Sequence, residues 1–292
     1  MSSRPTISVE ELVAHKADIV VIDASWIYGP FNQAGIDVRA RYCQAHIPGA
    51  WFLDLRSFAR AYPPQDARID AVTRPPRQVV RELIAAAVPA PQCPIVITDM
   101  DGGCTTAPFA RLLLIDSGYP NVRLLDGGTP AWTYVHRRRL TDDGPRFLEL
   151  AADAHTRSPA QEVGTDRFAT LADVAVAIAD PSRAQLLDCR GLPDNHGVLP
   201  EDYRTVEIPC TCIVRSPEVV EEAPHGHRFR KPPRLAALLA ERRVSSHANK
   251  IATCYFGVGA AVVATAFEIA GWGPVRVYAG SLIEYAQARW SG

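Results

Sequence analysis

The stretch IATCYFGVGAAVVATAFEIAGW, residues 251–272, decides the fold and draws attention to one thiol. Lys250–Thr253 is predicted to be a β-strand, and the apolar run from Gly259 is typical of a helix that ends at Gly271. Cys254 is then the first residue after the strand. The sequence therefore predicts a strand–loop–helix unit with a cysteine at the head of its loop.

This loop has the features of an anion-binding nest around Cys254. Gly257 and Gly259 can adopt backbone angles that turn the loop inward and aim its N–H groups at the centre. Those amides and the positive helix end favour a negative charge, so we expect a reactive thiolate. The alternative is a buried cysteine that only fills space, the usual role of a free cysteine. The glycines favour the functional interpretation, with Tyr255, Phe256 and Val258 beside the thiol.

The chain also contains a long internal repeat. The segment SGYPNVRLLDGGTPAW at 117–132 parallels AGWGPVRVYAGSLIEY at 270–285, an offset of 153 residues, and this offset places Asp101 at the position of Cys254. A period this long indicates a duplicated domain. Short Val- and Ile-rich runs alternate with helical patterns, as expected for open parallel sheets.

The predicted fold class is therefore α/β, with two tandem domains that each hold an open, mostly parallel sheet flanked by helices. We expect an N-terminal domain over residues 1–145, a linker over 146–159 and a C-terminal domain over 160–292. In this division the first copy carries Asp101 at the matching position, and the second carries Cys254.

Bulk composition excludes several classes of partner. The net charge of −1 argues against nucleic acid, and no apolar run approaches the roughly 20 residues that cross a membrane. The N-terminal residues MSSRPTISVEELVAHK contain no apolar signal core. Together with an odd count of seven cysteines, this predicts a cytoplasmic protein with reduced thiols.

Two short pairs are candidate zinc ligands. Cys210 and Cys212 form a C-x-C pair, and His225 and His227 form an H-x-H pair. Paired cysteines in structural zinc sites are usually separated by two to four residues, so a buried strand followed by a polar loop fits better. We predict no metal and no cofactor.

The loop chemistry favours sulfur over phosphate. Phosphate or arsenate needs a cationic side chain to share its charge, and CYFGVGA contains neither arginine nor lysine. A persulfide is a small, soft anion that backbone amides alone can hold. Cys254 would attack the outer sulfur of a donor, keep it as a persulfide and pass it to a nucleophile.

Six segments resemble the two-domain rhodanese-like sulfurtransferases, the family of thiosulfate and 3-mercaptopyruvate sulfurtransferases. They are IDASW (22–26), DVRARYCQAHIPGAWFLDL (37–55), LLDGGTPAW (124–132), LLDCR (186–190), CYFGVGA (254–260) and VYAGSLIEY (277–285). The resemblance implies a persulfide on Cys254 and an aspartate, here Asp101, in the inactive copy. By the same alignment Cys104 falls on Gly257, which makes its presence incidental.

The resemblance also shows departures at the substrate site. Asp188 and Arg190 retain the family's Asp-x-Arg, but its second arginine, which resembles a substrate anchor, falls on Asp194. Arg204 is a candidate substitute. Tyr255 and Phe256 replace the family's polar loop residues, so they are expected either to shape an apolar mouth or to pack on the N-terminal domain.

The sequence thus predicts a sulfurtransferase that acts through Cys254, with a thiosulfate- or 3-mercaptopyruvate-like donor. Substrate contacts are expected from Tyr255–Gly259, Arg190 and Arg204, with Asp188 in support. A thiol, cyanide or a sulfur-carrier protein would accept the sulfur. The alternatives are a non-catalytic binding or sulfur-carrier module and, less favoured, a phosphatase or arsenate reductase.

Overall fold

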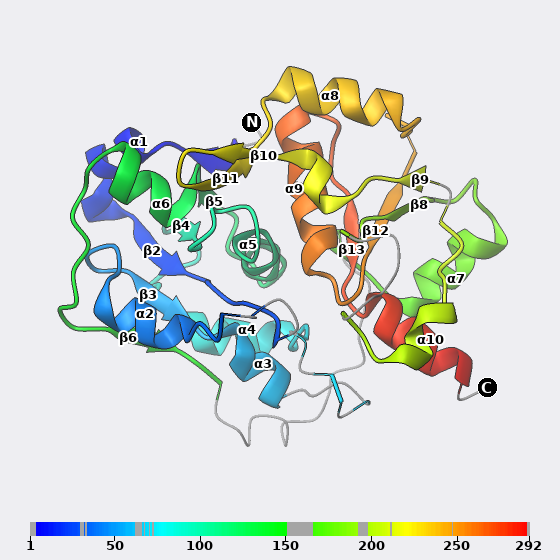
Figure 1. The fold of residues 1–292 in the computed structure, drawn as a ribbon, viewed down its shortest axis with the longest axis horizontal. Coiled ribbons are helices and arrows are strands. Elements are labelled where there is room, and N and C mark those ends of the chain that lie inside the picture. Colours follow the sequence, from blue (N-terminus) through cyan, green and yellow to red (C-terminus); the bar gives the residue numbers. More distant parts are fainter. Residues whose placement is uncertain are drawn as a thin grey trace.

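The computed structural model describes residues 4–29, 32, 34–61, 66, 68–69, 71, 73–150, 166–191, 198–210, 212–246 and 248–290. Two lobes lie side by side, each built around its own sheet (Figure 1). Within each sheet the neighbouring strands run parallel, and helices cover them. The predicted α/β class with parallel sheets flanked by helices is confirmed.

The first sheet has the order β1-β5-β4-β2-β3-β6. Its strands are β1 (Thr6–Ile7), β2 (Val20–Asp23), β3 (Trp51–Leu53), β4 (Ile95–Thr98), β5 (Val122–Leu125) and β6 (Arg146–Leu148). The helices of this lobe are α1 (Val9–Ala14), α2 (Val38–Gln44), α3 (Leu55–Ala61), α4 (Arg77–Ile84), α5 (Ala107–Asp116) and α6 (Gly128–Pro130), with short turns at Lys16–Asp18 and Ala131–Val135.

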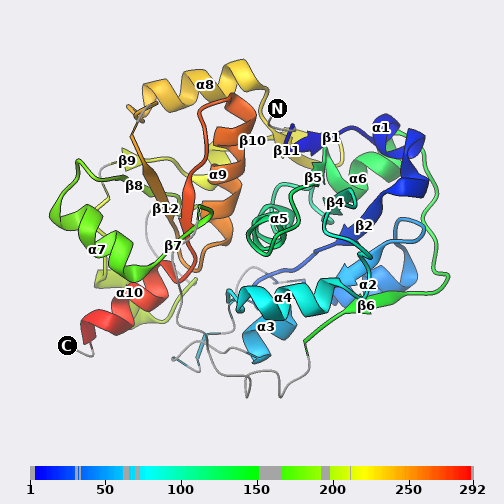
Figure 2. The same ribbon diagram turned by 180° about the vertical axis from the view of Figure 1, so that it is seen from behind.

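The second sheet has the order β7-β13-β12-β8-β9. Its strands are β7 (Phe168–Ala169), β8 (Gln185–Asp188), β9 (Cys212–Ile213), β12 (Lys250–Thr253) and β13 (Arg276–Tyr278). The helices are α7 (Leu171–Ala179), α8 (Pro232–Glu241), α9 (Val258–Ala270) and α10 (Ser281–Trp290), with turns at Glu201–Thr205 and Ser216–Val219. An antiparallel hairpin, β10 (Val220–Ala223) and β11 (Gly226–Phe229), reaches toward the first lobe (Figures 1 and 2).

Strand β6 lies inside the stretch 146–159 that the sequence suggested as a linker. It pairs with β3 at the edge of the first sheet, and Phe147 stacks edge-on against Tyr42 and Phe52. These aromatic contacts explain why the chain extends the sheet before it leaves the lobe. The limits of the domains stay a prediction.

Helices α5 and α9 form the contact between the lobes, and both are apolar on nearly every side. A helix that is hydrophobic all round must be buried, and these two are buried against each other and against their own sheets. The Glu268 carboxylate in α9 forms ion pairs with the guanidinium of Arg111 in α5, at 2.8 Å, and with that of Arg167, at 2.7 Å. The two lobes therefore share one continuous hydrophobic core.

Among the described residues, no helix combines the length and the apolar character that crossing a membrane requires.

Candidate active site

Cys254 stands where the sequence placed it, directly after β12 and ahead of α9. The hydroxyl of Ser281 accepts the N–H of Cys254 at 3.0 Å and donates to the carbonyl of Tyr278 at 2.7 Å. The N–H of Gly257 donates to Sγ of Cys254 at 3.1 Å. The loop is thus tied down at its start, and one backbone dipole points at the sulfur.

Gly257 makes this turn possible. Its φ of +92° lies in the left-handed region, which residues with a side chain rarely adopt. A Cβ at this position would also lie 3.0 Å from the backbone of Ala279. Glycine is therefore required both for the turn that brings its N–H to the thiol and for the close approach of the neighbouring loop.

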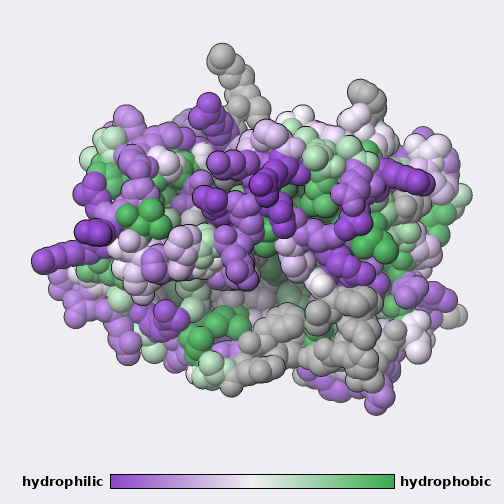
Figure 3. Space-filling model, turned by 45° about the horizontal axis from the view of Figure 1, so that its top comes forward, coloured by the Kyte–Doolittle hydropathy of each residue, from purple (hydrophilic) through white to green (hydrophobic). Residues whose placement is uncertain are grey.

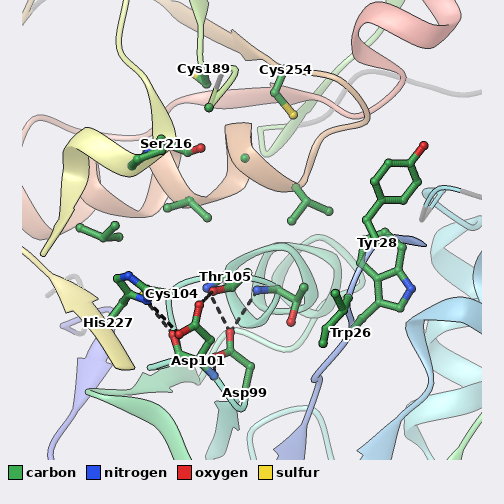
Figure 4. Close-up of a pocket in the computed structure, with 18 of the residues that line it drawn as sticks. Trp26, Tyr28, Asp99, Asp101, Cys104, Thr105, Cys189, Ser216, His227 and Cys254 are labelled. Carbon is green, nitrogen blue, oxygen red and sulfur yellow. Dashed lines mark hydrogen bonds and ion pairs between the residues drawn. The ribbon is translucent and has the colours of Figure 1, made fainter. Parts of the chain in front are cut away.

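A cavity of about 680 Å³ between the lobes gives access to the thiol. Cys254 is only 4% exposed, yet it is part of the cavity wall. The space-filling view shows the molecule hollowed near the middle of one face, where hydrophobic side chains show between hydrophilic ones (Figure 3). In Figure 4, Cys254 enters from one side, and Asp99, Asp101 and Trp26 lie across from it.

Both lobes supply the cavity wall. The second lobe contributes Cys189, Gly191, Ser216, Pro217, Val220, His227, Cys254, Tyr255, Phe256, Val258, Gly259 and Val262. The first contributes Trp26, Ile27, Tyr28, Asp99, Met100, Asp101, Cys104, Thr105 and Thr106. Four of the five loop and helix residues expected beside the thiol, Tyr255, Phe256, Val258 and Gly259, therefore face this space, and the fifth, Gly257, binds the sulfur.

Phe256 joins the two lobes through an aromatic cluster. Its ring lies 5.9 Å from that of Trp26 in an edge-on arrangement and 4.7 Å from that of Tyr28. The Tyr28 hydroxyl donates to the carbonyl of Val198 at 2.8 Å, which holds the cluster in place. Phe256 thus both lines the cavity and packs on the N-terminal lobe. Its contact with substrate stays a prediction.

The corresponding loop of the first lobe is filled by its own carboxylate. Asp99 is the first residue after β4, and its two oxygens accept five backbone N–H groups at 2.7–3.1 Å. The donors are the amides of Asp101, Gly103, Thr105, Thr106 and Ala107. An internal anion therefore occupies the place that an external anion would need.

This arrangement corrects the sequence alignment of the two copies. Asp101 was expected at the Cys254 position, but Thr98 and Thr253 end the matching strands, so Asp99 is the equivalent of Cys254. The strands are related by an offset of 155 residues. The loop at 99–106 is longer than the loop at 254–257, so the offset of 153 measured beyond the helices does not apply here.

Asp101 instead faces the cavity and bridges the lobes. One carboxylate oxygen lies 2.8 Å from Nδ1 of His227 in β11, and the other accepts the Thr105 hydroxyl at 3.0 Å. The side chains of Asp101 and His227 are each 43% exposed. This pair closes the part of the cavity wall opposite Cys254 (Figure 4).

Arg190 does not belong to the cavity wall in the described part of the chain. Its guanidinium binds the carboxylate of Asp188, with Nε at 3.0 Å and Nη2 at 2.8 Å. Asp188 therefore orients Arg190 and shares its charge. The side chain of Arg204 and the whole of Asp194 lie outside the described residues, so their expected roles stay predictions.

Two further cysteines line the cavity, but both are held as thiols. Burial raises the pKa of Cys104, and burial together with the nearby Cys254 raises that of Cys189 well above its usual value. Both are therefore protonated at neutral pH, and a protonated thiol is a poor nucleophile. Neither competes with Cys254 for the proposed chemistry.

The two pairs weighed as zinc ligands do not converge. The described residues contain no group of three or more His, Cys, Asp or Glu side chains that could hold a metal ion. The Cys212 thiol donates to the carbonyl of Arg242, while His225 stacks on Tyr134 with ring centroids 4.5 Å apart.

Sequence reasoning did not assign several residues of this cavity. The resemblance assigns no role to Trp26, and no local pattern marks Tyr28, Asp99 or Ser216 as cavity residues. The sequence marks His227 only through its H-x-H pair. Its position depends on how the β10–β11 hairpin packs across the lobes, which no local pattern encodes.

Comparisons with known proteins agree with this architecture. Residues 9–134 match the Rhodanese-like domain family. Human 3-mercaptopyruvate sulfurtransferase is 28% identical over 283 residues, 92% of this chain and 86% of that protein. Thiosulfate sulfurtransferase of Azotobacter vinelandii is 32% identical over 115 residues, 39% of this chain and 38% of that protein.

Solved structures show the same fold. SseA from Escherichia coli, described as having the rhodanese fold, aligns with a TM-score of 0.70 at 22% identity and covers 96% of this chain and 99% of its own. The chain therefore carries a rhodanese-like domain and the rhodanese fold, and its relatives are the 3-mercaptopyruvate and thiosulfate sulfurtransferases.

Proposed function

We propose that this protein is a sulfurtransferase that carries sulfur as a persulfide on Cys254. The observation that carries the proposal is the Cys254 thiol, bound by the Gly257 N–H at 3.1 Å and facing a cavity between the lobes. The relatives' names add thiosulfate and 3-mercaptopyruvate as the donor class.

The first half-reaction loads the sulfur. The Cys254 thiolate attacks the transferable sulfur of the donor and forms an S–S bond. The bond between that sulfur and the rest of the donor breaks, and its electron pair leaves with the remnant, which is sulfite for thiosulfate. The Gly257 N–H binds the thiolate before the attack and again when it is released.

The second half-reaction unloads it. A nucleophile attacks the outer sulfur, and the Cys254 sulfur leaves as a thiolate. The acceptor is a thiol, cyanide or a sulfur-carrier protein in this proposal. The cavity wall contains Tyr255, Phe256 and Val258, which keep bulk water from the persulfide.

The cavity argues against phosphate chemistry. The lining residues in the described ranges include neither arginine nor lysine. Transfer of a phosphoryl group builds charge on several oxygens and depends on cationic groups around them. A persulfide carries a single charge, which backbone N–H groups can stabilise without cationic side chains.

Three finer points belong to the same proposal. The two sheets share one strand order, apart from the added β6, which supports an origin by tandem duplication with domains near 1–145 and 160–292. The location is cytoplasmic, and the seven cysteines are all free, as reduced thiols there would be. Neither nucleic acid nor membrane is a partner.

The test is to transfer a sulfur atom from a donor to the protein and to locate the residue that carries it. The protein is incubated with thiosulfate or with 3-mercaptopyruvate, and intact-mass and peptide measurements locate an added sulfur atom. We expect it on Cys254, absent from Cys254→Ser and unchanged in Cys93→Ser, a cysteine outside the cavity wall. A protein that gains no sulfur from either donor, yet keeps its cellular role after Cys254→Ser, is the non-catalytic module instead.

A further inference from the structure

The cavity carries negative charge on the side that faces Cys254. Its described lining residues include the carboxylates of Asp99 and Asp101, while its only group able to carry a positive charge is His227. A thiolate or persulfide on Cys254 adds another negative charge.

The two carboxylates differ in what they can still bind. Asp99 is 1% exposed, and its oxygens are occupied by five backbone N–H groups. The Asp101 side chain is 43% exposed, and within the described part of the chain it binds His227 and Thr105. Asp101 is therefore the carboxylate that a bound molecule can reach.

Aromatic rings form another part of the wall. Trp26, Tyr28, Tyr255 and Phe256 all face the cavity. The faces of such rings attract cations, most strongly for tryptophan, and the attraction grows where water is excluded. Carboxylate and rings together favour a positive charge in the bound molecule, and they disfavour the negative charge of a carboxylate or sulfonate.

We propose that the molecule which collects sulfur from Cys254 is a small cationic nucleophile, of which an aminothiol is the simplest kind. This inference rests on the proposed function. The ammonium group lies between the Asp101 carboxylate and the aromatic wall, and the thiol reaches the persulfide. The acceptor thiolate RS⁻ attacks the outer sulfur of Cys254–S–SH, so the product is R–S–SH and the Cys254 thiolate, with no change in the number of electrons.

The volume leaves room for a small acceptor beside the sulfur on Cys254. About 680 Å³ is the size of pockets that hold whole drug-sized ligands. Thiosulfate or 3-mercaptopyruvate would fill a small part of it, and both are anions that the cavity opposes. The same charge therefore slows loading from these donors while it favours unloading to a cation.

The first experiment measures the charge preference without any persulfide. Cys254 is modified with 2-aminoethyl methanethiosulfonate, a cation, and with 2-sulfonatoethyl methanethiosulfonate, an anion, and mass spectrometry gives each rate. We expect the cation to react about tenfold faster than the anion, after division by the same ratio for free 2-mercaptoethanol. A corrected ratio of one or below overturns the inference.

The second experiment measures the acceptor itself. Cys254 is loaded with sulfur, the donor is removed, and the loss of sulfur is followed with cysteamine, 2-mercaptoethanol and mercaptoacetate. These thiols are close in size and differ in charge. Once the rates are corrected for the thiolate fraction of each, we expect them to fall in that order, by about tenfold overall. Faster transfer to mercaptoacetate overturns the inference.

Two variants assign the effect to the proposed group. Asp101→Asn should lower the cation-to-anion ratio by about threefold or more. His227→Gln removes the side chain that, among the described lining residues, is able to carry a positive charge, and it should leave the ratio unchanged or raise it. Asp142→Asn, an exposed aspartate outside the cavity wall, is the matched control and should leave the ratio unchanged. An unchanged ratio in Asp101→Asn contradicts the role of that carboxylate.

The outcomes separate this inference from the proposed function. If no donor loads Cys254 but the reagents still show the cation preference, the sulfurtransferase proposal fails and the charge of the cavity stands. If Cys254 loads normally and anionic acceptors are preferred, sulfur transfer stands and the cationic acceptor is wrong.

Discussion

The two lobes contain the same loop in two chemical states. After β4, the Asp99 carboxylate accepts five backbone N–H groups, and after β12, the Cys254 sulfur accepts one from Gly257. Both loops follow an inner strand of a parallel sheet and precede a buried helix. In the first loop the Asp99 carboxylate occupies the backbone N–H groups, whereas in the second loop the reactive Cys254 sulfur lies beside them.

This difference explains how one architecture serves structure in one lobe and chemistry in the other. A carboxylate surrounded by amides gains several charge-assisted hydrogen bonds and leaves no donor for a ligand. A sulfur that accepts one N–H from the described backbone is held by fewer contacts and can still exchange its bond partner. The first loop then contributes to the cavity only through residues such as Asp101 and Thr105, which face the second lobe.

Replacing Asp99 and Cys254 by alanine, one at a time, should show the largest difference in stability between the two loops. Asp99→Ala leaves five buried amides without an acceptor, and we expect the free energy of unfolding to fall by roughly 4 kcal/mol. Cys254→Ala removes one sulfur that faces a cavity and should cost about 1 kcal/mol. Urea unfolding of both variants measures the difference, with Asp142→Asn as the control for an exposed charge. Equal losses would mean that Asp99 does not hold its loop.

The sequence predicted much of the second loop because its signals are local. The strand at Lys250–Thr253 and the glycine that ends α9 in the left-handed conformation were both expected from residue type. Local signals also predicted the α/β class, since alternating strands and helices leave few other arrangements.

The equivalence of Asp99 and Cys254 could not be read in the same way. It depends on where β4 ends, and the different lengths of the two loops shift the simple repeat by two residues. The contact of His227 with Asp101 is even harder to predict from local sequence patterns, because it joins residues 126 positions apart. Tertiary packing of the hairpin alone determines it.

A second comparison concerns the aspartates that end β2 and β8. The Asp188 carboxylate is paired with the Arg190 guanidinium. Asp23 is buried, and its carboxylate accepts the Ser25 N–H at 2.9 Å. Burial raises the pKa of Asp23 to about 6. The folded state therefore holds this proton at pH values where the unfolded chain has released it, and stability falls as the pH rises from about 4 to above 6.

Asp23→Asn should remove this pH dependence. The amide keeps an acceptor for Ser25 without a charge, so the variant should gain on the wild type as pH rises, by about 3 kcal/mol at pH 7.5. At pH 4 the two should be nearly equal. Urea unfolding at both pH values tests this, and Asp188→Asn, which leaves Arg190 unpaired, should instead be less stable than wild type at pH 7.5. A constant difference across pH would contradict the raised pKa of Asp23.

The smallest expected difference in stability between two paired variants is that between the glycines at the two ends of α9. Gly257 and Gly271 both have positive φ, at +92° and +75°, but only Gly257 lacks room for a Cβ, since nothing lies within 4 Å of that position at Gly271. Gly271→Ala should therefore cost only backbone strain, about 1 kcal/mol, and Gly257→Ala about 2 kcal/mol.

The two variants should differ more in chemistry than in stability. Gly257→Ala moves the N–H that binds the Cys254 sulfur, so we expect alkylation of Cys254 by iodoacetamide at neutral pH to slow by about tenfold. Gly271→Ala lies at the far end of the helix and should react at the wild-type rate. Both substitutions strain the backbone, so Gly271→Ala is the control for strain alone. Equal rates in the two variants would show that the Gly257 N–H does not affect the reactivity of the Cys254 sulfur.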